Sequence, residues 1–379
     1  MNVVISTHVY TTGPAQDLRD YLISHKIDYL LFIGHPLFYN KKLSGSGLEM
    51  YKAGKKIYEK YQRIRNIPEI LSYIKDVFLN IIYVINSKRK YDLYVGSDNL
   101  NALSGILLKK LGYIKRVVYY VIDYNPHRFS NRFLNSIYHK IDQFCVRHAD
   151  ETWNLSPRME WGRKKYFGFS GGIQKIVPVG VWLDRIKAKP YKQIEKHTLV
   201  FMGHVTKKQG IQKVITAIPK VIKRIPDFKF IIIGGGNYIT ELKELVNKVH
   251  ANRSVVFTGY IENHEDIEKM LIKCAVAIAP YEKYDENGHL SFTYFADPAK
   301  IKLYLSSGLP VLLSKVPHNA TDIVDNNCGA IIKNNIHRNI VDILKNEKKL
   351  ETMREAAINY SRKFSWEKIF TQALNEKLG

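Results

Sequence analysis

The residues best suited to bind a ligand lie in the stretch 291–314. There Asp297 and Pro298 precede a short amphipathic run that carries Lys300 and Lys302 and ends before a Ser-Ser-Gly-Leu-Pro turn. Proline is favoured in a first helical turn, and an aspartate just before it can accept from backbone donors, so we expect a helix to begin here. A helix N-terminus carries partial positive charge, and two lysines beside it favour an anion, most simply a phosphate. An ordinary helix with solvated lysines is the alternative.

Two glycine loops in the second half of the chain could bring backbone donors to the same anion. Each loop follows an apolar strand, and its glycines lack the side chains that would keep a ligand away from the main chain. The first loop carries Gly203, His204, Lys207 and Lys208, and the second carries Gly234 and Gly235. The pattern G-x-G-x-x-G is absent, so the second loop is not a dinucleotide-binding fingerprint.

Polar residues directly beyond the strands of the first half are candidates for an acceptor site, because ligands of doubly wound sheets lie beyond the carboxyl ends of the strands. Gly13 and Pro14 follow the first strand and Asn101 follows another, so we assign all three to the acceptor side. Asp123 and His127 follow a third strand, and a carboxylate with an imidazole can act as a base or orient a hydroxyl group. A turn glycine and a capped turn are the alternatives.

The elements that position these residues alternate between strand and helix along the chain. Short runs that are apolar on both faces, as parallel strands are, alternate with amphipathic runs of helical period. This alternation predicts an α/β protein with doubly wound parallel sheets. At 379 residues the chain exceeds the usual size of a single core, so we expect two domains. Asp98 precedes one helix and is expected to cap it.

The formal charge of the chain is +23, and most of it lies in the first half. Residues 1–190 hold 30 Lys and Arg against 15 Asp and Glu, a net +15, and the remainder holds 28 against 20, a net +8. Such an excess implies an anionic lipid, a nucleic acid or a phosphorylated substrate as partner. We expect no nucleic-acid partner, because the basic stretches form no recognised reading module.

The stretch 41–90 is both basic and aromatic, with 12 Lys and Arg against 4 Asp and Glu. Its aromatic residues include Tyr51, Tyr58, Tyr61, Tyr73, Phe78 and Tyr83. Helical spacing would bring many of these side chains onto shared faces, which predicts an amphipathic surface that lies on anionic lipid. A solvated helical hairpin is the alternative.

Three further observations concern where the protein works. The chain opens on an apolar strand instead of a signal peptide, and its strongest apolar run, 77–85, is far shorter than the roughly 20 residues of a membrane span. The cysteines, Cys145, Cys274 and Cys328, are too widely separated for a disulfide framework or a zinc site. We therefore expect a cytoplasmic protein that is peripheral on the inner face of the cell membrane.

The pattern D-P-x-K-x-K-x-Y-L-x-x-G-L-P-V at 297–311 resembles the donor-site segment of family 4 glycosyltransferases. The resemblance implies the GT-B architecture, in which two Rossmann-like doubly wound domains face each other across a cleft. It predicts an acceptor-binding domain at 1–190, a donor-binding domain at 196–360, and a C-terminal helix at 361–379 that crosses back to the first domain. It also implies that Tyr260 and Ile261, which follow a strand-ending glycine, hold the nucleotide base.

The chain departs from the family pattern at two places. The family usually has a lysine directly before the glycine that ends the first loop, and here Gln209 stands in that position, with Lys208 displaced by one. The family also carries two glutamates eight positions apart, and their positions are occupied by Phe295 and Leu303. Asp297, together with Lys300 and Lys302, could replace that pair.

The prediction is a glycosyltransferase that moves a sugar from a nucleotide-sugar donor to a lipid-linked or glycan acceptor. Asp123, His127 and Asp297 are its catalytic candidates, and the resemblance implies retention of configuration. No D-x-D pair suited to a divalent ion is present, so we expect neither a metal nor another cofactor. The alternatives are a sugar-nucleotide epimerase or hydrolase on the same fold, and a non-catalytic membrane-binding protein on a glycosyltransferase scaffold.

Overall fold

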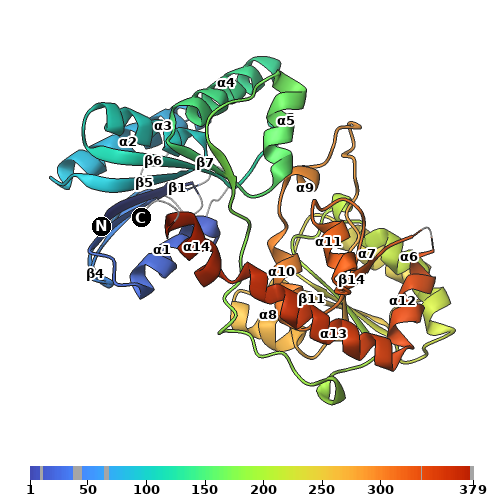
Figure 1. The fold of residues 1–379 in the computed structure, drawn as a ribbon. Coiled ribbons are helices and arrows are strands. Elements are labelled where there is room, and N and C mark those ends of the chain that lie inside the picture. The colour runs from blue at the N-terminus through green and yellow to red at the C-terminus, as the bar shows by residue number, and fades with distance from the viewer. Residues whose placement is uncertain (9–11, 37–44, 64–67, 334, 376–379) are drawn as a thin grey trace. The chain divides into compact units, whose positions relative to one another are not determined.

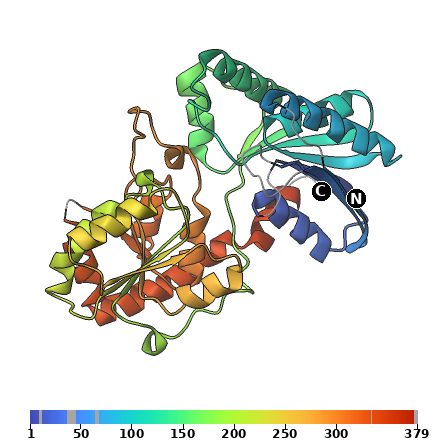
Figure 2. The same ribbon diagram turned by 180° about the vertical axis from the view of Figure 1, so that it is seen from behind.

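The computed structural model describes residues 1–8, 12–36, 45–63, 68–333 and 335–375. The chain divides into two compact units, Met1–Pro178 with Ile369–Gly379, and Val179–Lys368. In its described residues each unit contains one mainly parallel sheet with helices packed on it (Figures 1 and 2). The predicted class, α/β with two Rossmann-like doubly wound domains, is confirmed.

The sheet of the first unit has the strand order β4-β3-β2-β1-β5-β6-β7-β8. Its strands are β1 (Asn2–Thr7), β2 (Tyr29–Gly34), β3 (Gly45–Lys52), β4 (Lys55–Arg63), β5 (Tyr91–Ser97), β6 (Ile114–Val121), β7 (Glu151–Asn154) and β8 (Gln174–Ile176). Its helices are α1 (Pro14–Ser24), α2 (Glu69–Asn86), α3 (Asn99–Lys110), α4 (Arg132–His148) and α5 (Pro157–Phe167). The neighbouring strands β2, β1, β5, β6, β7 and β8 pair in parallel. Strand β3 pairs antiparallel with both β2 and β4, so that β3 and β4 form a hairpin beside β2. Helices α2 and α3 lie on one face of the sheet and α1 on the other (Figure 1).

The hairpin corrects one prediction from the sequence. The helical surface predicted for 41–90 is wrong for 45–63, which forms β3 and β4, and only α2 is helical within the described part of that stretch. The two strands are joined by Ala53 and Gly54, whose φ angles of 48° and 77° are both positive. A two-residue turn of this kind matches the twist of paired strands and closes a tight hairpin. Positions 41–44 and 64–67 of this stretch lie outside the described residues.

The sheet of the second unit has the order β11-β10-β9-β12-β13-β14, and all of its described pairings are parallel. Its strands are β9 (Thr198–Met202), β10 (Lys229–Ile233), β11 (Val255–Gly259), β12 (Val276–Ala279), β13 (Val311–Leu313) and β14 (Gly329–Ile331). Its helices are α6 (Ile211–Ile222), α7 (Ile239–Lys248), α8 (His264–Leu271), α9 (Phe292–Phe295), α10 (Ala299–Ser306), α11 (Ala320–Asp325), α12 (Ile336–Leu344) and α13 (Glu347–Ser361). Short 3₁₀ turns occur at Tyr191–Gln193, Lys207–Gln209 and Arg362–Phe364.

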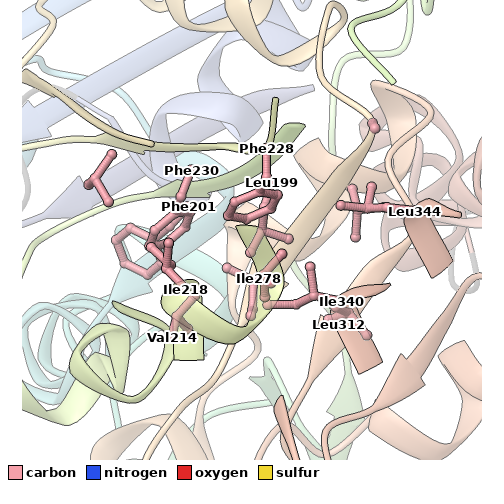
Figure 3. Packing of buried hydrophobic residues seen from close by; sticks show 14 of the residues in the cluster. Leu199, Phe201, Val214, Ile218, Phe228, Phe230, Ile278, Leu312, Ile340 and Leu344 are labelled. Atoms are coloured by element: carbon pink, nitrogen blue, oxygen red, sulfur yellow. The ribbon is translucent and has the colours of Figure 1, made fainter. Parts of the chain in front are cut away.

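Two hydrophobic cores hold the second sheet, one on each face. One joins the strands to α6, α7 and α12, and Figure 3 shows Val214 and Ile218 of α6 in this layer with Phe201 and Phe230 of the strands. The other core joins the strands to α8, α10 and α11, and it includes Tyr304 of α10. Burial of large apolar side chains on both faces fixes the ends of the parallel strands, where the glycine loops begin.

The last helix, α14 (Trp366–Asn375), lies within the predicted C-terminal helix 361–379 and buries Trp366, Ile369 and Phe370. The Phe370 ring lies 5.5 Å from that of Tyr21 in α1. The Trp366 indole lies so close to Gly180 that a Cβ there would come within 2.5 Å of it. Glycine is therefore required at 180 for the indole to pack.

Candidate functional site

Two glycine loops meet at the carboxyl edge of the second sheet. Gly203 follows β9 with a φ of 133°, and Gly234 follows β10 with a φ of 132°, both in the region that favours glycine. A Cβ on Gly234 would lie 2.1 Å from the carbonyl oxygen of Gly203, and one on Gly236 would lie 2.1 Å from that of Val205. At Gly235 the nearest atom to an added Cβ is 3.5 Å away. Gly234 and Gly236 therefore let the loops pack on each other, and Gly235 is the open position.

Lys300 of α10 reaches the same edge from a different element. Its Nζ donates to Oε1 of Gln209 at 2.8 Å, and an added Cβ on Gly203 would lie 3.0 Å from this Nζ. The ammonium lies 4.2 Å from the ring centroid of Phe201 and 5.1 Å from that of Tyr281. Burial lowers the pKa of Lys300 from 10.5 to about 7. The chain thus holds a partly desolvated cation against the first glycine loop.

Lys302 and Asp297 occupy a different environment, because they are buried and form an ion pair with each other. His318 Nε2 lies 3.2 Å from Asp297 Oδ1, and the amide of Val179 donates to Oδ2 at 2.9 Å. Burial would raise the pKa of Asp297, but Lys302 and His318 lower it. Burial lowers the pKa of Lys302, and Asp297 opposes this effect. Both groups are therefore held by buried partners around α10, and the catalytic role of Asp297 and the donor contact of Lys302 stay predictions. Lys300 is the lysine of α10 that lies against the first glycine loop.

The start of α10 corrects the expected cap. The helix begins at Ala299, with Pro298 in the capping position and no side-chain hydrogen bond to the first turn. The Asp297 carboxylate is turned to its buried partners, so it does not cap the helix. At the other end Gly308 has a φ of 74° and follows the last turn, as the sequence predicted for a glycine stop.

The remaining donor-side candidates are mostly exposed. His204, Lys207 and Lys208 lie on the first loop, and Lys207 pairs with Glu286 at 3.5 Å. Tyr260 has 75% of its surface exposed beyond β11. Ile261, next to it, is half-buried.

A cavity of about 1040 Å³ opens beside the first loop of the second unit. Lys207, Lys208, Tyr238 and Tyr284 are among its described lining residues, and Lys300 is not. Its four acidic lining residues are Glu241, Glu282, Asp285 and Glu286. The cavity therefore combines lysines suited to phosphate with acceptors suited to hydroxyl groups.

The first unit places its sequence candidates at the carboxyl ends of different strands. Asp123 forms an ion pair with Arg128, and the ring of exposed His127 packs edge-on to Tyr166 at 5.6 Å. Gly13 has a φ of 155° at the N-terminus of α1, which begins at Pro14. The catalytic roles of Asp123 and His127 stay predictions.

A buried polar network surrounds Asn101, and sequence reasoning missed most of it. Asn101 Nδ2 donates to Asp98 Oδ2 at 2.7 Å, and His8 Nδ1 lies 2.6 Å from the same oxygen. Asp98 Oδ1 accepts from the amides of Leu100 and Asn101 at 3.0 Å each, so the predicted helix cap is confirmed. On its other side, His8 Nε2 lies 3.4 Å from Oδ2 of Asp76 in α2.

The network extends to His35, whose Nδ1 lies 3.2 Å from Asp76 Oδ1 and whose Nε2 lies 3.0 Å from Asn80 Oδ1. Burial would lower the pKa of His8, but the two neighbouring carboxylates raise it to about 10. His8 and His35 directly follow β1 and β2, as polar site residues of doubly wound sheets do. That position was the signal in the sequence that could have found them.

Neither a metal-binding cluster nor a membrane-spanning helix occurs among the described residues. Within these ranges no group of three or more His, Cys, Asp or Glu side chains is arranged to hold a metal ion. No helix in the described part of the chain is long and apolar enough to cross a membrane.

Comparison with known proteins identifies the second unit. Residues 184–363 match the family model described as Glycosyl transferases group 1. The predicted resemblance is confirmed by this match, and with it the glycosyltransferase class of the domain.

The curated relatives have low sequence identity to this chain, and the alignments cover only part of each protein. An uncharacterized glycosyltransferase of Methanocaldococcus jannaschii, MJ1059, is 22% identical over 246 residues, which cover 60% of this chain and 54% of the relative. A GDP-mannose-dependent alpha-(1-6)-phosphatidylinositol monomannoside mannosyltransferase of Mycobacterium tuberculosis is 27% identical over 108 residues, covering 26% of this chain and 28% of the relative. The chain thus spans about half or less of the length of these relatives.

Solved structures match the fold over nearly the full chain. Sucrose-phosphate synthase from Thermosynechococcus elongatus aligns with a TM-score of 0.73 at 15% identity. The alignment covers 99% of this chain and 98% of the synthase chain. HepE of Anabaena in complex with UDP aligns with a TM-score of 0.70 at 15% identity and covers 99% of both chains. These similarities show the GT-B fold of the chain.

Proposed function

We propose that the chain transfers a sugar from a nucleotide-sugar donor, bound by the second unit, to a lipid-linked or glycan acceptor bound by the first unit. The observation that carries this proposal is the position of Lys300. Its ammonium touches Gln209, the residue that stands where the family usually has a lysine, and it lies against the first glycine loop. A cation from α10 thus replaces the missing one at the loop.

The chemistry at this edge follows from the charge that develops when the sugar leaves the nucleotide. The departing diphosphate gains negative charge, so preorganised cations and backbone donors lower the barrier. Lys300 supplies the inner cation, Lys207 and Lys208 supply outer ones, and the first turn of α10 supplies backbone N–H groups. The acidic side chains of the neighbouring cavity are suited to the hydroxyl groups of the sugar or ribose.

The acceptor class and the nucleotide are also part of the proposal. A lipid-linked acceptor is supported by the phosphatidylinositol monomannoside named for one relative and by the net +15 of residues 1–190. UDP is a reasonable first nucleotide to test, because the HepE structure of the same fold holds it. Retention of configuration, independence of metal ions, and a peripheral position on the inner face of the cell membrane complete the proposal.

The test is a screen of nucleotide sugars by thermal shift and nucleotide release, with and without a lipid-linked acceptor. We expect one donor to stabilise the wild-type protein and to release nucleotide faster when acceptor is present. Lys300→Ala should remove this stabilisation, whereas Lys248→Ala, at an exposed lysine near the end of α7, should not. Nucleotide release that is independent of any acceptor would favour a hydrolase, and an isomerised free sugar nucleotide would favour an epimerase.

A further inference from the structure

Helix α2 of the first unit buries polar side chains beside the apolar Tyr83 and Val84, and it exposes a row of large apolar side chains. Its inward face carries Asp76 and Asn80, which are 1% and 0% exposed. Asn80 accepts from Ser6 Oγ at 2.6 Å and donates to Asn101 Oδ1 at 2.8 Å, while Asp76 accepts from Ser46 Oγ at 3.1 Å. The buried polar network therefore occupies part of the face that a surface helix normally fills with apolar side chains.

The outward face of α2 is correspondingly apolar. We call it the outer row, and it consists of Ile70, Leu71, Ile74, Phe78 and Ile82, with exposed fractions of 55%, 53%, 48%, 61% and 46%. Four of the five recur at intervals of four residues, so they share one side of the helix over about 18 Å. The charged residues between 70 and 86, Lys75 and Asp76, pair with each other at 2.9 Å. The outer row thus exposes a contiguous apolar strip without an unpaired charge.

A strip of this kind is unusual on a protein that remains alone in water, because large exposed apolar patches mark contact surfaces. The surrounding charges indicate which contact. Lys88, Arg89 and Lys90 follow the C-terminal end of α2 and are exposed, as are Lys55, Lys56 and Lys60 of the β3–β4 hairpin. The hairpin also exposes Ile57, Tyr58 and Tyr61 at 55%, 47% and 48%. An apolar strip on α2, with basic residues after the end of this helix and on the hairpin of the same unit, fits anionic lipid, whereas two copies with this charge would repel each other.

We propose that the outer row of α2 inserts into the interfacial layer of an anionic membrane and that the neighbouring lysines and arginine contact the lipid headgroups. The proposal rests on the proposed function, since it gives the first unit a surface that brings it to a lipid-linked acceptor. The buried network explains how the helix keeps this orientation. If α2 were rotated to bury Phe78, the outer row would pack against His8 and His35, and Asp76 would lose its hydrogen-bond partners.

The experiment is co-sedimentation of the full chain with phosphatidylcholine vesicles that contain either no phosphatidylglycerol or about one third of it. The test variant is Ile74→Ser/Phe78→Ser/Ile82→Ser, and the matched control is Leu111→Ser/Ile173→Ser/Ile176→Ser, which changes three residues of the same unit that are 60%, 53% and 45% exposed. We expect wild type and control to bind the anionic vesicles, more weakly as salt is raised, and the test variant to bind at least about tenfold more weakly.

Two results would overturn the proposal. Lipid binding that is unchanged in the test variant removes the outer row from the interface. The other result is that neither protein binds lipid, while the wild type is a dimer and the test variant is a monomer. The outer row would then contact a second copy of the chain instead of a membrane. Nucleotide binding, measured on the same proteins without vesicles, separates the two proposals. If the wild type binds nucleotide but no lipid, only the membrane proposal fails. If it binds lipid but no nucleotide, the proposed function fails instead.

Discussion

Replacing Lys300 by methionine is expected to stabilise the protein while it weakens the donor site. Burial lowers the pKa of Lys300 from 10.5 to about 7, and at about 1.4 kcal/mol per pH unit this corresponds to at most roughly 5 kcal/mol of cost for the charged form. The contacts with the Phe201 and Tyr281 rings offset about 0.5–2 kcal/mol each, and the hydrogen bond to Gln209 about 1 kcal/mol. Methionine keeps the length of the side chain without the charge, so we expect a gain of roughly 0–3 kcal/mol at pH 6.

The gain should depend on pH in a defined direction. Between pH 7 and 10.5 the unfolded chain still holds the proton that folded Lys300 has lost, so the stability of the wild type rises with pH in this window. The variant lacks this contribution. The difference between Lys300→Met and wild type should therefore be largest below pH 7 and should shrink toward pH 10, as measured by urea unfolding at several pH values.

The same substitution should remove binding of a nucleoside diphosphate, and in the wild type that binding should weaken as pH rises through 7, because the neutral amine does not attract phosphate. Lys302→Met is the matched control: it removes the partner of the buried Asp297 carboxylate, so it should destabilise by about 3–5 kcal/mol. A Lys300→Met protein that is less stable than wild type at pH 6, or whose stability difference does not change with pH, would refute this reasoning.

Three further predictions concern the rest of the framework. Asp297→Asn should cost roughly 3–5 kcal/mol of unfolding free energy, because it leaves Lys302 charged and buried, and equal stability in urea would refute the structural role of the pair. Gly234→Ala should destabilise and weaken nucleotide binding, since its Cβ would lie 2.1 Å from a carbonyl oxygen, whereas Gly235→Ala, with 3.5 Å of clearance, should be tolerated; similar melting temperatures for both would contradict the loop packing. His8→Gln should reduce the free energy of unfolding most at low pH. The pKa of His8 is about 10 in the folded protein and 6.5 ordinarily, so its protonation stabilises the fold fully below pH 6.5, and this stabilisation is lost as pH rises through 10. A stability difference between wild type and variant that grows with pH would contradict this role of His8.

Much of the fold was predictable because strand and helix periods are local. The apolar strand predicted before the first glycine loop is β9, and the turn at Gly308 ends α10 as its sequence indicates. The hairpin at 45–63 was missed because its tyrosines and lysines fit a helical face as well as a strand. The turn at 53–54 that decides between them contains alanine, which is uncommon at positive φ, so it gave no strong signal.

The site was predictable in outline but not in detail. The carboxyl edges of the strands and the lysines of α10 were visible in the sequence, yet Lys300 and Lys302 could not be told apart. Two residues of separation on a helix turn one ammonium toward Gln209 and the other toward Asp297. In the buried network, Asp76 contacts two histidines that lie far before it in the chain, His8 and His35, and no local pattern reports such contacts.

We propose that Lys300 supplies the cation that the first glycine loop lacks at position 209, where Gln209 stands. The most direct test is titration calorimetry of UDP and GDP with wild type, Lys300→Ala and Lys300→Ala/Gln209→Lys. We predict that the wild type binds one of these nucleotides, that Lys300→Ala binds it at least about tenfold more weakly, and that the double variant regains most of the affinity because it restores a lysine before Gly210. Equal affinity in all three proteins, or no nucleotide binding by the wild type, would contradict the account.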